Sequence, residues 1–493
     1  MSSAEAPLPA GACRLTLDNR PEATVLACAL ARRFAAGLGF DERELGRIEL
    51  GVEEAVSNVV RHAFAPDELN HFDVVLRPCA LGLEVLIRDQ GRPFDPGSVP
   101  AFDPDAEDPM TGGLGMHLIR SAFDEVEYRN LGQGGKETRL LKYRELAPVE
   151  PRPLPVDDRA IAEPVRDIRL FQPQDALEVA RLIHEAYGYS YPFEHIYFPE
   201  RVAALNASGE LVSALALGES GTLAGHAALV PDPDRPDRAE LAIVVTRPGF
   251  RGQGVARRLG DFLLDQARAR GLRLLFTNAV TAHPYTQRFM QQLGFRDCAL
   301  LPGHAPASLR FRKIAERLPQ RESCVYAVRF LDPEARMQRC AVLPARHRAA
   351  IEAIHAELDL PLRVLAPGPL PALPARARID AAVHHGLELA QLRLLAWGED
   401  ALAVLRARLA EFRRARMAVI ELQLPCGEAH TARMFDAVES LGFVFTGIEP
   451  GVRPDEDQLV LNLVNDVGFD YAALALHSLL AQRLREHILH VTA

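Results

Sequence analysis

Three polar side chains stand four residues apart in the stretch from Glu42 to Phe64: Glu54, Asn58 and His62. Apolar residues recur there at helical spacing, so we predict one amphipathic helix with the three side chains on a single stripe. A carboxamide oxygen can ligate a hard cation, and a carboxylate one turn away can act as a base. The pair suits a metal-bound triphosphate, whereas an isolated stripe of this kind usually marks only a solvated helix face.

Two glycine-containing motifs follow this helix. The predicted strand Leu83–Asp89 runs into an Asp-Gln-Gly turn, where Asp89 can accept a hydrogen bond from an exocyclic amine. In the motif that follows, Thr111–Tyr128, a second helix is predicted, and it opens from a loop of three glycines: Gly112, Gly113 and Gly115. Such a loop offers backbone N–H groups and the positive end of the helix dipole to a phosphate. The motifs together predict a nucleotide site.

The order of helix, Asp-x-Gly turn, glycine loop and a last strand at 134–143 resembles the ATP-binding domain of the GHKL superfamily, above all the anti-sigma-factor serine kinases. The resemblance covers about residues 10–145. It implies that Glu54 is the catalytic base, that Asn58 holds Mg²⁺ and that Asp89 reads the adenine amine. It also implies that Thr138 supports that adenine contact. Three glycines would shape the nucleotide lid: Gly91, Gly113 and Gly115.

Two departures refine this resemblance. Pro93 stands where the superfamily prefers a second glycine, so we expect a stiffer lid hinge. No separate helix with a phosphoacceptor histidine precedes the domain, and His62 is read as structural, which argues against a histidine kinase.

Composition bounds the possibilities further. The 493 residues suffice for about three domains, and 48% hydrophobic with 25% charged residues is typical of a globular protein. A net charge of −10 gives no electrostatic indication of nucleic-acid binding. We find no signal-peptide pattern, no apolar run of membrane length and seven scattered cysteines. We therefore expect a cytoplasmic protein with reduced thiols and neither nucleic acid nor membrane as a partner.

The proline-rich segment 146–164 predicts a linker between a domain at 1–145 and a second domain at 165–330. In the second domain the predicted strand Glu240–Thr246 leads into a glycine turn that opens a helix. The N–H groups of this turn suit a pyrophosphate. A further strand follows, and then a helix that closes on Leu-Gly-Phe at 293–295. This arrangement resembles the GCN5-related N-acetyltransferases.

The acetyltransferase resemblance implies that the acetyl-CoA pyrophosphate lies on the backbone of six residues: Arg251, Gly252, Gln253, Gly254, Val255 and Ala256. It also implies that the pantetheine arm runs along the strand from Ile243 to Val245. The family's common proton-donating tyrosine is replaced here by Met290, and its usual upstream asparagine by His283. Tyr285 is the substitute proton donor that we predict, with simple packing as the alternative.

Two further features bear on the acetyl acceptor. Glu240 either relays a proton from the amine through water or is only a solvated residue at a strand end. A run of aromatic residues from Tyr187 to Phe198 forms either a substrate-facing wall or local packing beneath a long loop.

The remainder, 331–493, repeats the pattern of the second domain without its cofactor turn. Leu441-Gly442-Phe443 matches the earlier Leu-Gly-Phe, but Trp397-Gly398-Glu399-Asp400 replaces the glycine turn. Two carboxylates there would repel a pyrophosphate, so we predict a degenerate acetyltransferase-like domain that binds no acetyl-CoA. Packing, dimerisation and sensing remain its possible roles. A last helix over Asp470–Leu489 is expected to pack on it.

The predicted fold class is α/β (α+β): an N-terminal GHKL-type α/β sandwich followed by two acetyltransferase-like mixed-sheet domains. We expect an ATP-dependent serine/threonine kinase module that acts on an anti-sigma antagonist-type regulator or binds a sigma factor, coupled to an N-acetyltransferase, with homodimerisation open. The expected cofactors are ATP, Mg²⁺ and acetyl-CoA. The alternatives are an acetyltransferase with an ATP-sensing domain and a non-catalytic protein responsive to both ligands. Glu54 favours phosphoryl transfer, whereas Met290 favours sensing in the second domain.

Overall fold

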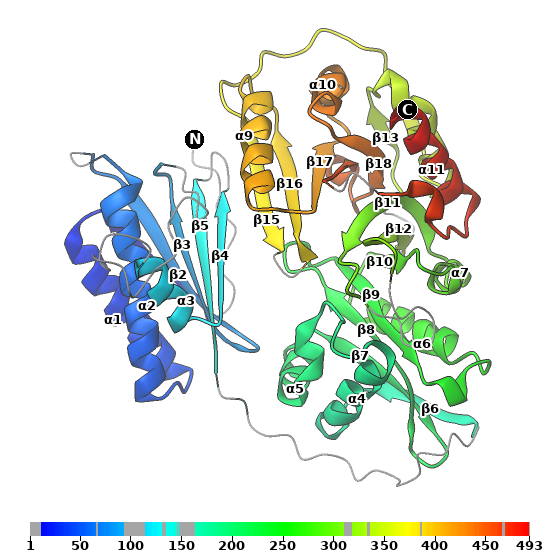
Figure 1. Cartoon of the computed structure of the whole chain (residues 1–493), viewed down its shortest axis with the longest axis horizontal. Helices are drawn as coiled ribbons and strands as arrows, with labels where there is room; N and C mark the ends of the chain where they lie inside the picture. The colour runs from blue at the N-terminus through cyan, green and yellow to red at the C-terminus, as the bar shows by residue number, and fades with distance from the viewer. Residues whose placement is uncertain are drawn as a thin grey trace. The chain divides into compact units, whose positions relative to one another are not determined.

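The computed structural model describes residues 11–65, 68–92, 114–130, 135–144, 146, 163–309, 318–332, 336–384, 387–465 and 469–492. The chain divides into two compact units (Figure 1). The first comprises Met1–Leu146 with Arg376–Val383, and the second comprises Ala147–Ala375 with His384–Ala493. Each unit is described below by itself.

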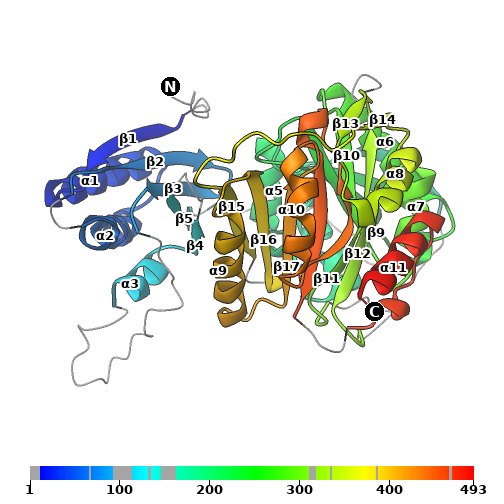
Figure 2. The ribbon, with the colours of Figure 1, turned by 90° about the horizontal axis from the view of Figure 1, so that it is seen from above.

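The first unit is a two-layer sandwich. Its described residues form an antiparallel five-stranded sheet of order β1-β2-β3-β5-β4. The strands are β1 (Cys13–Asp18), β2 (His71–Cys79), β3 (Gly82–Asp89), β4 (Glu125–Asn130) and β5 (Lys136–Tyr143). One face of the sheet is covered by α1 (Pro21–Gly37), α2 (Glu42–Asn58) and α3 (Leu114–Ala122), as Figures 1 and 2 show.

Helix α2 forms where the sequence predicts it. Asp41 caps its N-terminus by accepting the N–H of Glu44 at 2.8 Å, and acidic residues in the first turn complement the helix dipole. Its apolar stripe is buried against the sheet. The predicted helix continues past Asn58 as a π-helical turn, Val59–Ala63. Such wide turns recur at functional sites, and this one directly follows the candidate metal ligand.

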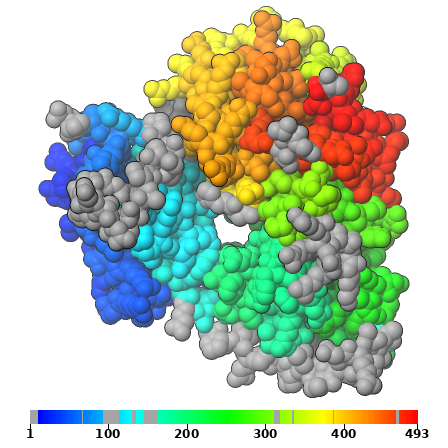
Figure 3. All heavy atoms as spheres, in the orientation of Figure 1, coloured from blue at the N-terminus to red at the C-terminus, as the bar shows by residue number. Residues whose placement is uncertain are grey.

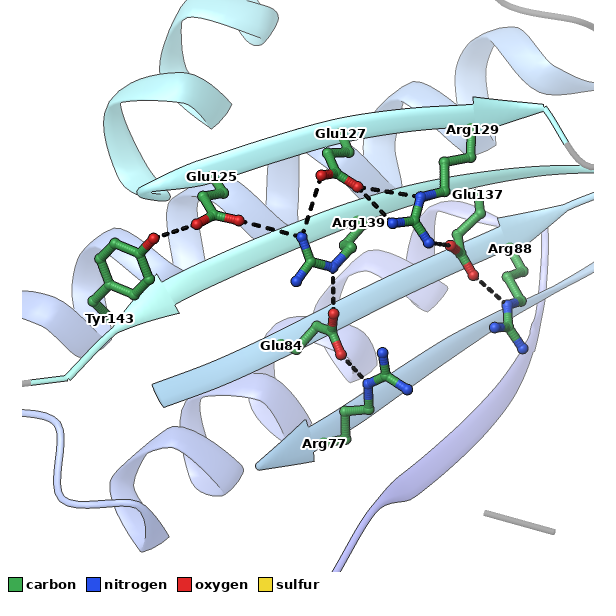
Figure 4. Close-up of polar contacts among 9 residues, drawn as sticks. All are labelled: Arg77, Glu84, Arg88, Glu125, Glu127, Arg129, Glu137, Arg139 and Tyr143. Carbon is green, nitrogen blue, oxygen red and sulfur yellow. Dashed lines mark hydrogen bonds and ion pairs between the residues drawn. The ribbon is translucent and has the colours of Figure 1, made fainter. Parts of the chain in front are cut away.

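The opposite face of this sheet carries an extended network of ion pairs (Figure 4). Alternate residues of a strand share a face, so charged side chains of four strands meet there. Glu84 and Glu137 are each only 3% exposed, and each contacts two arginines. The members of the network are Arg77, Glu84, Arg88, Glu125, Glu127, Arg129, Glu137, Arg139 and Tyr143. The buried carboxylates of this face are therefore compensated.

The described part of the second unit contains a continuous sheet of order β16-β17-β19-β18-β11-β12-β10-β9-β8-β7-β6. One half consists of β6 (Val165–Leu170), β7 (Val212–Gly218), β8 (Leu223–Pro231), β9 (Arg238–Thr246), β10 (Leu274–Val280), β11 (Arg296–Ala305) and β12 (Glu322–Phe330). The other half consists of β16 (Leu389–Ala396), β17 (Val419–Pro425), β18 (Val444–Glu449) and β19 (Gln458–Val464), whereas β15 (Arg378–His384) belongs, except for His384, to the first unit. The halves join where β11 pairs with β18.

Helices accompany both halves of this sheet. The first half has α4 (Ala176–Tyr187), α5 (Pro199–Ser208), α6 (Val255–Ala269) and α7 (Tyr285–Gln292). The second half has α8 (Arg348–Glu357), α9 (Ala401–Arg414), α10 (Ala429–Glu439) and α11 (Leu479–Thr492), with a small parallel sheet of β13 (Arg339–Ala341) and β14 (Leu362–Val364). Side chains of α6 and α7 form one hydrophobic core with the sheet.

The C-terminal helix differs from the prediction. Helix α11 begins at Leu479, and the residues before it include only a short 3₁₀ turn, Tyr471–Ala473. The backbone of Ala475 donates to Thr281 O at 3.0 Å, and the side chain of Gln287 bonds Ala475 O at 2.8 Å. These tertiary hydrogen bonds satisfy backbone groups of the segment, so it does not need a helix to do so. Helix α11 packs on β11 and β18, and Figure 3 shows its red atoms lying on the green part of the chain.

The predicted fold class is confirmed: a GHKL-like α/β sandwich precedes GNAT-like mixed sheets. In the described ranges, no helix combines the length and apolar character needed to cross a bilayer.

Candidate active sites

The first candidate site lies where α3 begins beside α2. A Cβ built on Gly115 would lie 2.8 Å from Glu54 Oε2 and 3.8 Å from Asn58 Oδ1. Only glycine leaves this space open, and it brings the N-terminal end of α3 to both side chains. Glu54 and the Asn58 amide oxygen therefore lie beside the start of α3, where free N–H groups favour anions. Their roles as base, metal ligand and phosphate site stay predictions. Gly112, Gly113 and Pro93 lie outside the described residues.

Asp89 ends β3 and is 4% exposed. Its Oδ1 accepts the N–H of Gly91 at 2.9 Å and lies 3.2 Å from Lys136 Nζ. Burial raises the pKa of Asp89, while Lys136 and the Gly91 N–H act in the opposite direction. Among the described residues, none hydrogen-bonds its Oδ2. One oxygen is thus fixed by the protein, and the other fits an exocyclic amine.

The turn after Asp89 depends on close backbone contacts. A Cβ on Gly91 would lie 2.3 Å from Ala63 O, so only glycine lets this turn pack against the π-helical turn. Lys136 also donates to Arg92 O at 2.7 Å and so ties β5 to the same turn. Lys136 was missed in the sequence, although the Gly-Gly-Lys start of the last strand was a usable signal. Thr138 faces Ile87 in the strand register and therefore shares a sheet face with Asp89.

The second candidate site lies where β9 and β10 diverge. The two strands pair in parallel only from Arg238 to Glu240, and beyond that the edge of β9 from Leu241 onwards has no paired neighbour among the described strands on the β10 side. Ile243 has a φ of +55° and lies in a bulge of β9, where Ile243 and Val244 stand against the single residue Ala227 of β8. This geometry opens the strand edge along Ile243 to Val245, where the pantetheine arm is predicted.

His226 holds this distorted strand, and the sequence did not indicate it. Burial lowers its pKa to about 4, so the ring is neutral. Its Nδ1 lies 2.9 Å from Ile243 O, and its Nε2 lies 3.0 Å from Ser213 Oγ. Since a carbonyl only accepts, Nδ1–H donates to Ile243 and the Ser213 hydroxyl donates to Nε2. The carbonyl of the strained residue is thereby satisfied.

The glycine turn before α6 has the backbone that a pyrophosphate site requires. Gly252 and Gly254 have φ values of +83° and +70°, and Gly254 is the N-cap residue of α6. Residues 251–254 are exposed, and a Cβ on either glycine would meet no other atom within 4 Å. The N–H groups at the start of α6 are therefore accessible to an anion.

The predicted substitute proton donor, Tyr285, lies on the helix α7. Tyr285, in the first turn of α7, is 63% exposed, and its ring centroid is 5.2 Å from that of His283. Met290 is buried in the core beneath α6 and α7. The role of Tyr285 stays a prediction.

The third domain places an aromatic residue where a cofactor turn would begin. Trp397 is 2% exposed, and its Nε1 donates to Thr431 Oγ1 at 2.8 Å. Asp400 then stands at the N-cap position of α9, without a side-chain capping hydrogen bond. Its lack of acetyl-CoA binding and our domain boundaries at 146, 165 and 331 stay predictions.

Comparison with known proteins matches one family to each of the two domains that carry the candidate sites. The histidine kinase-like ATPase domain family matches residues 17–142, and the acetyltransferase (GNAT) family matches residues 177–295. Serine-protein kinase RsbW of Listeria monocytogenes (serovar 1/2a) is 31% identical over 119 residues, which are 23% of this chain and 76% of that protein. RsbW of Bacillus subtilis is 29% identical over 121 residues, 22% of this chain and 71% of that protein.

Among solved structures, a GNAT-family acetyltransferase from Desulfovibrio desulfuricans aligns with 34% of this chain and all of its own, at 23% identity and a TM-score of 0.27. The fold and the matched families define an enzyme that joins a kinase-type ATP-binding domain to an acetyltransferase domain. Through its N-terminal domain the chain belongs to the RsbW family of serine-protein kinases.

Proposed function

We propose that this chain is a cytoplasmic regulatory enzyme that phosphorylates a serine or threonine of an anti-sigma antagonist-type regulator, with a sigma factor as a second partner. Its second domain transfers an acetyl group from acetyl-CoA to an amine. The observation that carries the kinase proposal is the approach of Gly115 to both Glu54 and Asn58. This approach supports the proposal, because the two side chains that would serve as base and metal ligand lie beside a helix start that would hold phosphate.

Each residue of the kinase site has a defined task. The Asn58 amide oxygen holds Mg²⁺, and the free Oδ2 of Asp89 accepts the adenine amine. Glu54 takes the proton of the acceptor hydroxyl, and the backbone at the start of α3 holds the phosphates. Bound Mg-ATP supplies the phosphoryl group. This chemistry needs positioning and charge neutralisation more than covalent help.

The acetyltransferase proposal is supported by the turn at Gly252 and Gly254 and by the open edge of β9. Acetyl-CoA would lie with its pyrophosphate on this turn and its pantetheine along the edge. Titration calorimetry of the full chain with acetyl-CoA tests the proposal, and an absence of heat would contradict it.

The kinase proposal is tested with Glu54→Gln in the full chain. Transfer from labelled ATP to candidate regulators encoded beside this gene should fall on the order of 10²–10⁴-fold, the usual value of a positioned base. ATP binding should be unchanged. Glu53→Gln is the matched control, because Glu53 is the exposed neighbour on the same helix. Full activity of Glu54→Gln would exclude Glu54 as the base, whereas an absence of transfer by the wild-type chain to every candidate regulator would leave the domain as an ATP sensor.

A further inference from the structure

His304 lies at the end of β11, in a segment whose direction is set by a bulge. The register of β11 against β12 shifts between Leu301 and Ala305. Within it, Gly303 has a φ of +63°, its N–H donates to Ser323 Oγ at 3.0 Å and its carbonyl accepts Arg321 Nε at 2.8 Å. The backbone at His304 is therefore anchored on both sides.

The third domain supplies the partner of this histidine. His304 Nδ1 lies 2.9 Å from Oε1 of Glu421 in β17, which is 4% exposed. The other oxygen of Glu421 accepts Gln391 Nε2 at 2.8 Å, and Gln391 Oε1 lies 3.0 Å from His384 Nε2. A carboxylate only accepts, so Nδ1–H donates to it and the lone pair of a neutral ring lies on Nε2. Within the described ranges, no residue hydrogen-bonds Nε2.

The second domain supplies acceptors for a cation. Glu240 lies at the last paired position of β9 and β10, and its Oε1 accepts Asn278 Nδ2 at 3.0 Å. Asn278 Oδ1 is buried and has no hydrogen-bond partner in the described part of the chain. A carboxylate and an orphaned amide oxygen thus stand at the point where the strands diverge. This pair suits a donor that brings several N–H groups, which a primary ammonium does.

The charged groups around His304 shift its pKa, which bears on its ability to transfer a proton. Burial lowers the pKa of His304, the carboxylates of Glu421 and Glu240 raise it, and Arg321 lowers it, with a net shift above the ordinary value. The carboxylate of Glu240 thus contributes to raising the pKa of His304. A cation held by Glu240 would lie within the same field.

We propose that His304, oriented by Glu421 of the third domain, removes the proton of the ammonium group that accepts the acetyl group. This inference rests on the proposed acetyltransferase function. Nε2 takes one proton from R–NH₃⁺, and the freed lone pair forms the C–N bond at the thioester carbonyl carbon. The C–S bond breaks with its electron pair on sulfur, and the second amine proton ends on that thiolate. The third domain thereby completes the acceptor site although its own cofactor turn is lost.

The test supplies the full chain with acetyl-CoA and three soluble amines: spermidine, a lysine peptide with a blocked N-terminus, and a peptide with a free N-terminal alanine. Liberated coenzyme A is measured by chromatography. We expect transfer to at least one amine. On that amine, His304→Gln should lower kcat on the order of 10²–10⁴-fold with unchanged acetyl-CoA affinity. Glu240→Gln should act mainly by raising the KM for the amine.

Glu421 is a positioning residue, so its test is a pH profile. The pKa of His304 falls when the carboxylate of Glu421 is removed. Glu421→Gln should therefore move the acid limb of the kcat profile to lower pH. Glu421→Asp, which keeps a carboxylate, should bring the limb part of the way back. His384→Gln, at the far end of the same hydrogen-bond chain, should leave the limb in place. If His304→Gln loses activity only because its melting temperature falls, the shift of the acid limb of kcat in Glu421→Gln decides whether His304 removes the proton.

Three outcomes would overturn these ideas separately. Absence of acetyl-CoA binding overturns the proposed acetyltransferase function itself. Binding without transfer to any of the three amines overturns only the acceptor class. Wild-type kcat and an unshifted acid limb in the His304 and Glu421 variants overturn the assigned proton path.

Discussion

Ala299 of β11 pairs directly with Gly447 of β18, and the two residues occupy equivalent places in the two halves of the second unit. Each follows its own Leu-Gly-Phe sequence by the same number of residues. Each strand also shifts register just before this pair, at Asp297/Ala299 and at Phe445/Gly447. Antiparallel pairing of equivalent residues is what a local two-fold relation produces, so the sheet joins two related halves.

This junction should not tolerate a side chain at Gly447. A Cβ there would lie 2.4 Å from both Ala299 Cα and Cys298 O, and the residue has a φ of +148°. We expect Gly447→Ala to cost about 1–3 kcal/mol in overpacking and a similar amount in backbone strain. Urea unfolding measures the loss. Gly271→Ala is the control, since Gly271 has a φ of +73° but nothing within 4 Å; equal losses would refute the clash.

Acidification should weaken the same unit through Glu449. Burial alone would raise the pKa of Glu449, but Arg238, Arg235 and Arg393 lower it to about 2. Arg238 Nη1 and Arg235 Nη2 lie 2.8 and 2.6 Å from its Oε1. A depressed pKa contributes stability above the unfolded value of 4.5, and this is lost as pH falls toward 2. Glu449→Gln should therefore destabilise at pH 7, by about 3–5 kcal/mol, and less at pH 3. A pH-independent difference in melting would contradict this.

Asp89→Asn should weaken ATP binding by roughly 1–3 kcal/mol, because the amide spoils a charge-assisted hydrogen bond in a buried site. Since burial raises the pKa of Asp89, wild-type affinity should begin to fall at a higher pH than an ordinary aspartate would give. Calorimetry with Mg-ATP measures both effects. Asp73→Asn is the control, as Asp73 instead accepts Thr16 Oγ1 on β1. Unchanged affinity in Asp89→Asn would refute the adenine contact.

Gly115→Ala should impair phosphoryl transfer more than folding. The added methyl would lie 2.8 Å from Glu54 Oε2, so the carboxylate must move away from its position beside α3. A misplaced catalytic group can cost on the order of 10²-fold in rate. Phosphoryl transfer and the melting temperature are measured together. Gly46→Ala, in open space on α2, should leave the rate unchanged and stabilise the helix by about 1 kcal/mol. A wild-type rate in Gly115→Ala would place the reaction elsewhere.

Gly254→Val should abolish the acetyl-CoA response. At a φ of +70° a β-branched residue is strained, so the turn before α6 must change shape and its N–H groups lose their common direction. Thermal shift with acetyl-CoA reads this out. Gly209→Val, at a φ of +83° after α5 and away from the turn, should be destabilised by itself yet keep the ligand shift. An equal ligand shift in wild type and Gly254→Val would refute the site.

The sequence alone predicted the parts of both sites that depend on local geometry. Glu54 and Asn58 share a helix face because they are one turn apart, and residues of neighbouring strands follow the period of the pleat. Gly252 and Gly254 indicate a turn, because only glycine adopts a positive φ at little energetic cost. These features are properties of a few adjacent residues, so they can be recognised without knowing the fold.

Only the tertiary structure revealed the features that depend on contacts between segments distant in the sequence. The start of α11 depends on Gln287 and Thr281, which hold the preceding residues extended, and apolar spacing cannot reveal that competition. The meeting of His304 with Glu421 depends on β11 and β18 pairing across the two halves. Backbone hydrogen bonds between strands are the same for almost every residue type, so which strands become neighbours leaves little trace in the local sequence.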